Sequence, residues 1–304
     1  TLFWFPQNKT AVAKSKKNNK KRLLVVHTIK QGDYGMFGAI IGDIVGSVYE
    51  FNNIKTKQFN LFDAKCRFTD DSVMTFAVAE ALRKSQKKDF KNLSEQAIKE
   101  MQKFGKLYPL VGYGRSFRSW LKDENPQPYG SYGNGAAMRI SPVAYFAKSL
   151  EEVKVLSKEV TAVSHNHPEG LKGAESTAVA IWLALNKKSK EEIKNYIEEH
   201  YYKLDFDYET LKEQYSFKES SQNTVPQAIF CFLISESFED CLRTSISIGG
   251  DSDTLCAISC AIAEAYYGIP KHIHSAVIQF LDKRLTNLYK KYYEKSTKLI
   301  EIWF

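Results

Sequence analysis

Two short acidic segments carry side chains that could do chemistry. Thr69-Asp70-Asp71 and Asp251-Ser252-Asp253-Thr254 each place two carboxylates beside hydroxyl groups at the start of a predicted helix. An N-cap accounts for one aspartate at such a position, because its oxygen accepts a helix N–H. The second segment leads into one of the most apolar stretches of the chain. Carboxylates buried there without a partner are costly, and a bound cation is the usual remedy.

The donor atoms of these two segments favour a hard divalent cation. All of them are oxygens, and no Cys or His stands at a metal-ligand spacing. Such ligands favour Mg²⁺ or Mn²⁺ and argue against Zn²⁺. With Glu50 the chain offers five carboxylates, enough to neutralise two divalent ions, and two-metal sites are typical of hydrolases that activate water.

Three further segments carry polar residues that a plain helical scaffold does not require. Asp43 and Glu50 are seven residues apart, so on one helix they could share a face. Asp43 is interpreted as a capping or supporting acid, whereas Glu50 is expected to end an apolar helix. The glycine-rich segment 130–135 could hold a phosphate at a helix N-terminus, although a plain turn fits it as well. Ser164–Pro168 holds two histidines and is equally compatible with an ordinary polar loop.

The elements that must position these residues are almost all helical. Asp71 or Ser72 is the expected N-cap of the first predicted helix, and the nearly non-polar run Asp253–Tyr267 is expected to be a buried central helix. Strand patterns are nearly absent, and only Thr244–Ile248 alternates briefly. We therefore predict one compact all-α domain over residues 36–304. The predicted helices are Asp71–Lys84, Leu93–Leu107, Leu150–Val163, Leu171–Leu185, Lys190–Tyr201, Val225–Ser237, Asp253–Tyr267 and, as one long or two shorter helices, Ile273–Ile300.

The formal charge of +8 resides mainly in the first 35 residues. They hold eight lysines and arginines against one aspartate, which leaves the rest of the chain nearly neutral. We expect residues 1–35 to be a basic, disordered extension, with Met36 as a candidate natural start. A basic arm that contacts nucleic acid or a membrane surface is the alternative for this segment only.

The five cysteines point to a reducing compartment. Their number is odd, they lack paired metal spacing, and Cys231, Cys256 and Cys260 lie in apolar helical runs where a free Cys is usually a small buried hydrophobe. No apolar run approaches the ~20 residues that a membrane span needs. We expect a cytoplasmic protein without a membrane partner and, by default, a monomer.

Read in order, five motifs resemble those of the ADP-ribosylglycohydrolase family, which includes the enzyme that reactivates ADP-ribosylated dinitrogenase reductase. The glycine loop and the segment at 224–233 are most similar to the branch acting on serine-linked and polymeric ADP-ribose. The motifs are GAIIGDIVGSVYE at 38–50, FTDDSVM at 68–74, GSYGNGAAMRISP at 130–142, SHNHP at 164–168 and SIGGDSDTLCAISCAIAEAYYG at 247–268.

The resemblance implies an orthogonal multi-helix fold and a centre of two Mg²⁺ ions, or Mn²⁺ in some members. His165 would contact ADP-ribose, and residues near Val225 and Phe230 would wall the adenine. The loop that would hold the diphosphate and distal ribose comprises Gly130, Ser131, Tyr132, Gly133, Asn134 and Gly135. The implied metal ligands are Glu50, Thr69, Asp70, Asp71, Asp251, Asp253 and Thr254.

The chain departs from the family pattern at three places. Ser252 replaces a common Thr, while Cys260 and Glu264 stand where small glycines are often found. Glu264 falls in the middle of the predicted central helix and has no partner that the sequence identifies.

The reaction implied is hydrolysis at the anomeric carbon of an ADP-ribosyl group, with release of ADP-ribose. Glu50, Asp70, Asp71, Asp251 and Asp253 are the candidate catalytic residues, and Glu50 is the one expected to handle protons. A two-metal phosphohydrolase and a non-catalytic ADP-ribose-binding relative are the alternatives. The substrate could be an ADP-ribosylated protein or a smaller conjugate, because the leaving group is not identified by these motifs.

Overall fold

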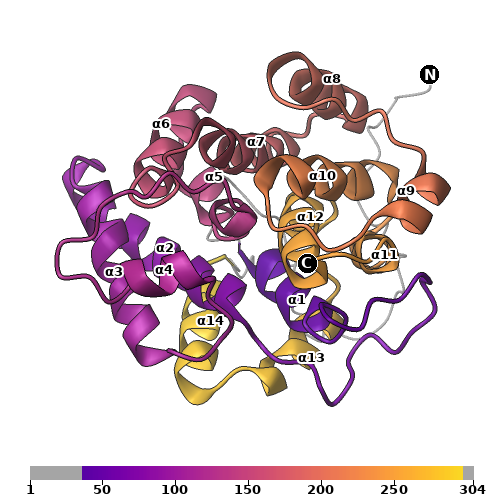
Figure 1. Cartoon of the computed structure of the whole chain (residues 1–304), viewed down its shortest axis with the longest axis horizontal. Helices are drawn as coiled ribbons and strands as arrows, with labels where there is room; N and C mark the ends of the chain where they lie inside the picture. The colour runs from indigo at the N-terminus through magenta and orange to yellow at the C-terminus, as the bar shows by residue number, and fades with distance from the viewer. Residues whose placement is uncertain (1–35, 297–304) are drawn as a thin grey trace, which may run out of the picture.

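Helices make up nearly all of the regular structure between residues 36 and 296, the part of the chain that the computed structural model describes. The predicted extension over residues 1–35 and the end of the predicted C-terminal helix lie outside the described residues. Within residues 36–296 there is no named strand, and the only bridge joins Gly133 to Ser220. The all-α prediction is confirmed (Figure 1).

The chain forms fourteen α-helices within the described range. They are α1 (Phe37–Gly46), α2 (Asp70–Ser85), α3 (Leu93–Leu107), α4 (Arg115–Trp120), α5 (Pro142–Phe146), α6 (Leu150–Thr161), α7 (Pro168–Leu185), α8 (Lys190–His200), α9 (Tyr208–Gln214), α10 (Val225–Ile234), α11 (Phe238–Ser247), α12 (Ser252–Tyr267), α13 (Lys271–Val277) and α14 (Lys283–Ser296). The 3-10 helices are η1 (Gln86–Lys88), η2 (Asn134–Ala136), η3 (Ser221–Asn223) and η4 (Ile278–Phe280).

Helix α12 is the buried centre of the fold, as predicted. Every residue from Ser252 to Ala265 is buried, and the helix packs against α1, α7, α10 and α11 (Figure 1). Apolar side chains cover this helix on most sides, so its N-terminus delivers the second acidic segment into the interior.

Helix α1 lies directly on the backbone of α12 because three glycines follow one another at four-residue spacing. A Cβ on Gly38 or Gly42 would stand 2.2 Å from a carbonyl oxygen of α12, and one on Gly46 would stand 2.5 Å from the next such oxygen. No side chain fits at these distances. The sequence reasoning did not identify this stripe, although the spacing Gly38, Gly42, Gly46 is visible in the chain.

Glu264 has a partner on α1. Its carboxylate is 2% exposed, and the backbone N–H of Gly38 donates to its Oε2 at 2.8 Å. Burial raises the pKa of Glu264 to about 8. The first turn of α1 has no side-chain cap of its own at Met36, so this acid from the neighbouring helix satisfies a donor that would otherwise be unpaired.

Several predicted boundaries are wrong in detail. Thr69, not Asp71 or Ser72, is the N-cap of α2, because it is extended and its hydroxyl accepts from the N–H of Asp71. Thr244–Ile248 belongs to the end of α11 and its C-cap. Helices α4, α5 and α9, of five to seven residues, were not predicted because so few residues carry too little periodicity to reveal a helix. Helix α11 was also missed.

The predicted C-terminal segment is two helices. Helix α13 ends at Val277 and α14 begins at Lys283, where the carboxylate of Asp282 accepts from the N–H of Leu285 at 2.8 Å. Between residues 36 and 296, no helix combines the length and apolar character that a bilayer crossing requires.

Candidate active site

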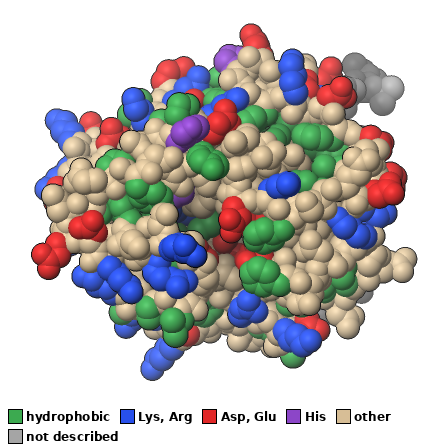
Figure 2. Space-filling view, viewed as in Figure 1, with side chains coloured by type: hydrophobic (Ala, Val, Ile, Leu, Met, Phe, Trp, Pro, Cys, Tyr) green, Lys and Arg blue, Asp and Glu red, His purple; other side chains and the backbone are tan. Residues whose placement is uncertain are grey.

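A pocket of about 670 Å³ gathers the predicted site residues from segments far apart in the chain. Acidic side chains lie in a hollow near the middle of the face shown in Figure 2. Of the predicted metal ligands, catalytic residues, glycine-loop residues and His165, only Thr69 does not line the pocket; it is 4% exposed. Those that line it are Glu50, Asp70, Asp71, Gly130, Ser131, Tyr132, Gly133, Asn134, Gly135, His165, Asp251, Asp253 and Thr254.

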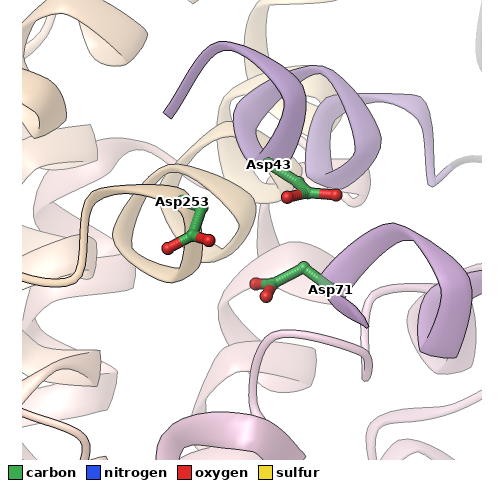
Figure 3. Close-up of side chains that lie close together, drawn as sticks. All are labelled: Asp43, Asp71 and Asp253. Carbon is green, nitrogen blue, oxygen red and sulfur yellow. The ribbon is translucent and has the colours of Figure 1, made fainter. Parts of the chain in front are cut away.

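Three helices each contribute one buried carboxylate to a cluster at this pocket; Asp71 and Asp253 line the pocket, whereas Asp43 does not. Asp43 of α1, Asp71 of α2 and Asp253 of α12 turn toward a common space (Figure 3). One oxygen of each lies within 4.8 Å of the others, close enough for a single cation to contact all three. We call these residues the inner triad.

A second group shares Asp253 with the inner triad. Glu50, Asp251 and Asp253 also bring one oxygen each within 4.8 Å of one another, and we call them the outer triad. Glu50 is half-buried, in a turn beyond α1, so the expectation that it ends a helix is wrong: α1 ends at Gly46. Glycine at position 46 and the turn that follows bring Glu50 toward α12 rather than along the α1 axis.

Asp43 holds the first turn of α2. Its Oδ2 accepts from the backbone N–H of Thr69 at 2.9 Å and of Ser72 at 3.0 Å, and its Oδ1 accepts from the hydroxyl of Thr69 at 2.6 Å. The interpretation of Asp43 as a capping acid is therefore confirmed, with the difference that it caps a neighbouring helix. This arrangement fixes the position of Asp70 and Asp71 relative to α1.

Two hydrogen bonds join the acidic segments to each other and to the glycine loop. Thr254 Oγ1 donates to Asp71 Oδ1 at 3.1 Å, and Asn134 Nδ2 donates to Asp251 Oδ2 at 2.7 Å. Both pairs are buried, so each bond is made in surroundings where an unpaired polar group is costly. The two halves of the site are thereby held in a single arrangement.

The glycine-rich segment is an irregular loop fastened to residues 219–221. Asn134 N–H donates to the carbonyl of Glu219 at 2.8 Å, and Ser221 N–H donates to the carbonyl of Tyr132 at 2.9 Å. Gly130 adopts φ +68°, a left-handed conformation that favours glycine. The expectation that the loop opens into a helix is wrong, because it leads only into the single turn η2.

His165 lies beneath this loop and is 4% exposed. Its ring meets those of Phe117 and Tyr129 edge to face. Val225 and Phe230, near which the resemblance implies an adenine wall, do not themselves line the pocket; both are buried, and Phe230 packs on Phe206.

Comparison with known proteins identifies the family. The family model described as ADP-ribosylglycohydrolase matches residues 34–299, most of the chain. The chain belongs to the ADP-ribosylglycohydrolase family. This is a family of hydrolases, and the chain is accordingly an enzyme of that class.

Individual relatives of this family member support the assignment. It is 26% identical to ADP-ribosylhydrolase ARH3 of Mus musculus over 310 residues, covering 76% of this chain and 82% of that protein. It is 25% identical to ADP-ribosyl-[dinitrogen reductase] glycohydrolase of Rhodospirillum rubrum over 257 residues, covering 76% and 84%. A solved structure titled "ADP-ribosylglycohydrolase-related protein complex" shares the fold, with a TM-score of 0.61, 20% identity and coverage of 86% of this chain and 96% of that one.

The acids of this family member form no ion pair with a Lys or Arg of the described residues, although the charge of Arg67 acts on Glu50. No Lys or Arg of the described residues lies within 4.0 Å of the six carboxylates, and Arg243, eight residues before Asp251, pairs with Glu239. Burial, reinforced by the charge of Asp253, raises the pKa of Glu50 to about 8 and holds that of Asp71 well above its usual range. Burial also raises the pKa of Asp251 to about 6. An oxygen-lined, uncompensated acidic site of this kind fits a divalent cation.

Sequence reasoning missed several residues that line the pocket. Arg139 stands inside the motif at 130–142 but received no role, and Arg115 lies in a short helix that was not predicted. The remaining missed residues include Phe117, Tyr129, Met138, Phe217 and Glu219. Only Arg139 had a usable signal, as a charged residue between apolar neighbours.

Proposed function

We propose that this enzyme is a metal-dependent glycohydrolase that cleaves the bond between an ADP-ribosyl group and its carrier and releases ADP-ribose. One observation carries the proposal. The inner and outer triads share Asp253 in a pocket that the glycine loop and His165 also line. A site for cations thus adjoins a site able to hold a phosphorylated sugar.

The metal proposed is a pair of Mg²⁺ ions, with Mn²⁺ as the alternative. The number of carboxylates, their oxygen donors and the absence of a nearby Lys or Arg among residues 36–296 support it. Such ions supply Lewis-acid polarisation and orient ribose hydroxyls or water. The residues that would hold them are Glu50, Thr69, Asp70, Asp71, Asp251, Asp253 and Thr254, and the structure adds Asp43 as a candidate.

Thr69 is the weakest member of that proposed ligand set. Its hydroxyl donates to Asp43, and Thr69 does not line the pocket. Its carbonyl or hydroxyl oxygen would therefore reach a cation only from behind the pocket wall. Asp43, in contrast, stands within the inner triad. Asp43 also has its oxygens engaged by α2, which makes it a supporting acid as well as a candidate ligand.

The substrate proposed for the pocket is an ADP-ribosyl group. The loop over residues 130–135, with its backbone held by residues 219–221, would bind the diphosphate and distal ribose, and His165 would contact the same ligand. Asn134 of the loop donates a hydrogen bond to Asp251, so substrate bound at the loop would lie next to the acidic site. The scissile bond would then lie beside the outer triad.

Glu50 is the residue proposed to handle a proton at that bond. It is the only half-buried member of the outer triad, whereas Asp251 and Asp253 are buried, and it lines the pocket. Cleavage through an oxocarbenium-like state needs a carboxyl acid or base at the glycosidic bond. The other carboxylates would hold the site together and orient the sugar.

A product assay tests the proposed reaction. The purified protein is incubated with defined conjugates (arginine-linked, serine-linked, polymeric, O-acetyl ester and nucleic-acid-linked ADP-ribose) in Mg²⁺, Mn²⁺ or EDTA. We expect free ADP-ribose with Mg²⁺ or Mn²⁺ and a loss of at least a hundredfold in EDTA. Inorganic phosphate or a nucleoside monophosphate would instead identify a phosphohydrolase, and binding without turnover would identify a non-catalytic relative.

The role of Glu50 is tested by a matched pair of variants. Glu50→Gln removes the titrating group while keeping size and hydrogen-bonding capacity, and we expect a loss of about 10²–10⁴-fold in kcat. Glu219→Gln changes another carboxylate that lines the same pocket but belongs to neither triad, and it should retain most activity. Full turnover by Glu50→Gln would reduce Glu50 to a structural ligand.

The carrier is proposed to be a modified protein or a small ADP-ribosyl conjugate. The relatives named above act, by their names, on dinitrogen reductase or as ADP-ribosylhydrolases. Five buried free cysteines are consistent with a reducing compartment, and we propose a cytoplasmic monomer. Gel filtration and localisation of the tagged protein test these two points.

A further inference from the structure

Arg139 is a buried cation behind the glycine loop. It is 1% exposed, it lines the pocket, and no ion pair joins it to an acid in the described part of the chain. Its guanidinium lies 4.9 Å over the ring of Phe117, and its Nε has no hydrogen-bond partner. Burial lowers its pKa to about 10, so it still carries its charge at neutral pH. A buried charge kept without an acid beside it calls for a reason.

The hydrogen bond that Arg139 donates determines the direction of a second hydrogen bond, between Ser164 and His165. Arg139 Nη2 lies 2.8 Å from Ser164 Oγ, and a guanidinium can only donate, so the Ser164 oxygen accepts. Ser164 Oγ also lies 2.9 Å from Nδ1 of His165. Ser164 is fully buried, and its hydroxyl reaches no other acceptor among residues 36–296. If its hydrogen did not point to His165, it would be buried without a partner, which is costly.

This geometry determines the tautomer of His165. Because the Ser164 hydroxyl donates to Nδ1, that nitrogen is an acceptor and carries no hydrogen. Burial and the nearby charge of Arg139 hold the pKa of His165 well below its usual range, so the ring is neutral. A neutral imidazole with a bare Nδ1 carries its hydrogen on Nε2.

Nε2 of His165 faces the glycine loop. A Cβ on Gly133 would stand 3.7 Å from it and one on Gly135 would stand 3.6 Å from it. No described residue accepts a hydrogen bond from this nitrogen. The Nε2–H therefore points into the part of the pocket beside Gly133 and Gly135, where the loop has no side chains.

We propose that Arg139 is a positioning residue that acts through Ser164 to hold His165 as its Nε2–H tautomer, ready to donate to an oxygen of the bound diphosphate or ribose. The hydrogen bonds from Arg139 through Ser164 to His165 give the pocket a neutral donor that cannot act as a base. The fixed positive charge of Arg139 behind this donor suits an anionic ligand. The identity of the ligand rests on the proposed function, whereas the tautomer does not.

The tautomer is measured directly by NMR of the histidine ring nitrogens in the free protein. The His165 signals are assigned by their loss in His165→Gln. We expect a hydrogen-bearing Nε2 and a bare Nδ1 in the unmodified protein, and a mixture of tautomers in Ser164→Ala. A hydrogen on Nδ1 in the unmodified protein would overturn the proposal.

Binding of ADP-ribose, measured by calorimetry without turnover, provides the second readout. Ser164→Ala should weaken binding about tenfold, the effect of one hydrogen bond. Ser164→Thr keeps the hydroxyl and should restore both tautomer and affinity. Ser157→Ala is the matched control, because Ser157 is a buried serine of α6 whose hydroxyl has no partner. Equal affinities for Ser164→Ala and Ser157→Ala would overturn the proposal.

The two proposals fail in different ways. Suppose that no ADP-ribose is released but that the tautomer and the loss of affinity in Ser164→Ala are as expected. This result would count against the proposed hydrolysis and support the hydrogen-bond series from Arg139 to His165. Normal release of ADP-ribose with the opposite tautomer of His165 would count against that hydrogen-bond series alone.

Discussion

Thr254 and Asp71 are 183 residues apart in the chain, yet the Thr254 hydroxyl donates to the Asp71 carboxylate at 3.1 Å. This bond crosses from the N-terminus of α12 to the N-terminus of α2 and unites the two acidic segments. Each segment alone resembles a capped helix start. Together they form a cluster of carboxylates that could hold a cation, and the bond joins its two halves.

Loss of this bond should lower activity without unfolding the protein. Thr254→Val is nearly isosteric and removes only the hydroxyl, and we expect kcat/KM for ADP-ribose release to fall about 10–100-fold. The concentration of Mg²⁺ needed for half-maximal activity should rise. Thr161→Val is the control, because Thr161 is equally buried and its hydroxyl has no partner. Similar kinetics for the two variants would contradict a role for Thr254 at the metal site.

Asp43 should stabilise the fold through its acceptor oxygens, independently of any metal. In EDTA, we expect Asp43→Ala to unfold with a free energy at least about 2 kcal/mol lower than Asp43→Asn, because Asn keeps an oxygen for the N–H groups of Thr69 and Ser72. Both variants lack the charge, so their difference isolates the hydrogen bonds. Urea titrations that superimpose would show that Asp43 does not hold α2.

The packing of α1 on α12 should not tolerate a methyl group at its centre. Gly42→Ala places a Cβ 2.2 Å from the carbonyl oxygen of Cys256, and backbone cannot move aside as a flexible side chain can. We expect a loss of more than about 2 kcal/mol in the free energy of unfolding. At Gly114 a Cβ meets nothing within 4 Å and φ is −56°, so Gly114→Ala should change stability by less than about 0.5 kcal/mol. Equal losses would mean that the helices separate easily.

Glu264 should make stability fall as pH rises. Its pKa is about 8 in the folded protein and about 4.5 once the chain unfolds, so between these values the folded state holds a proton that the unfolded state has released. The stabilising effect of that proton is complete below about pH 4.5 and is lost as the pH passes 8. Relative to Glu264→Gln, the free energy of unfolding of the unmodified protein should fall by a few kcal/mol between about pH 4.5 and pH 8.

The measurement for Glu264 is the difference in unfolding free energy between the two proteins at several pH values from 5 to 9. Other titrating groups contribute equally to both proteins and cancel. A difference that is constant with pH, or that moves in favour of the unmodified protein as pH rises, would show that the Glu264 carboxyl ionises normally within the fold.

Much of the fold could be read from the chain because local periodicity is strong in its long helices. The bounds of Leu93–Leu107 agree with the structure, and Asp253–Tyr267 was recognised as buried from its lack of polar residues. Both inferences need only neighbouring residues, since the helical period and the apolar content are local properties. Short helices such as α4 and α5 contain too few turns to show that period.

The residues of the candidate site were also visible locally, as acids and glycines that a helical scaffold does not need. Their partners were not. Glu264 has no explanation until α1 packs on α12 and brings Gly38 to its carboxylate, and Asp43 caps a helix that begins 27 residues later. The tautomer of His165 depends on Arg139, which reaches it through Ser164 from a different segment. A sequence records which groups need a partner, because polarity and charge belong to single residues. Which partner each one meets depends on helix packing, where a few ångströms decide whether a hydrogen bond forms.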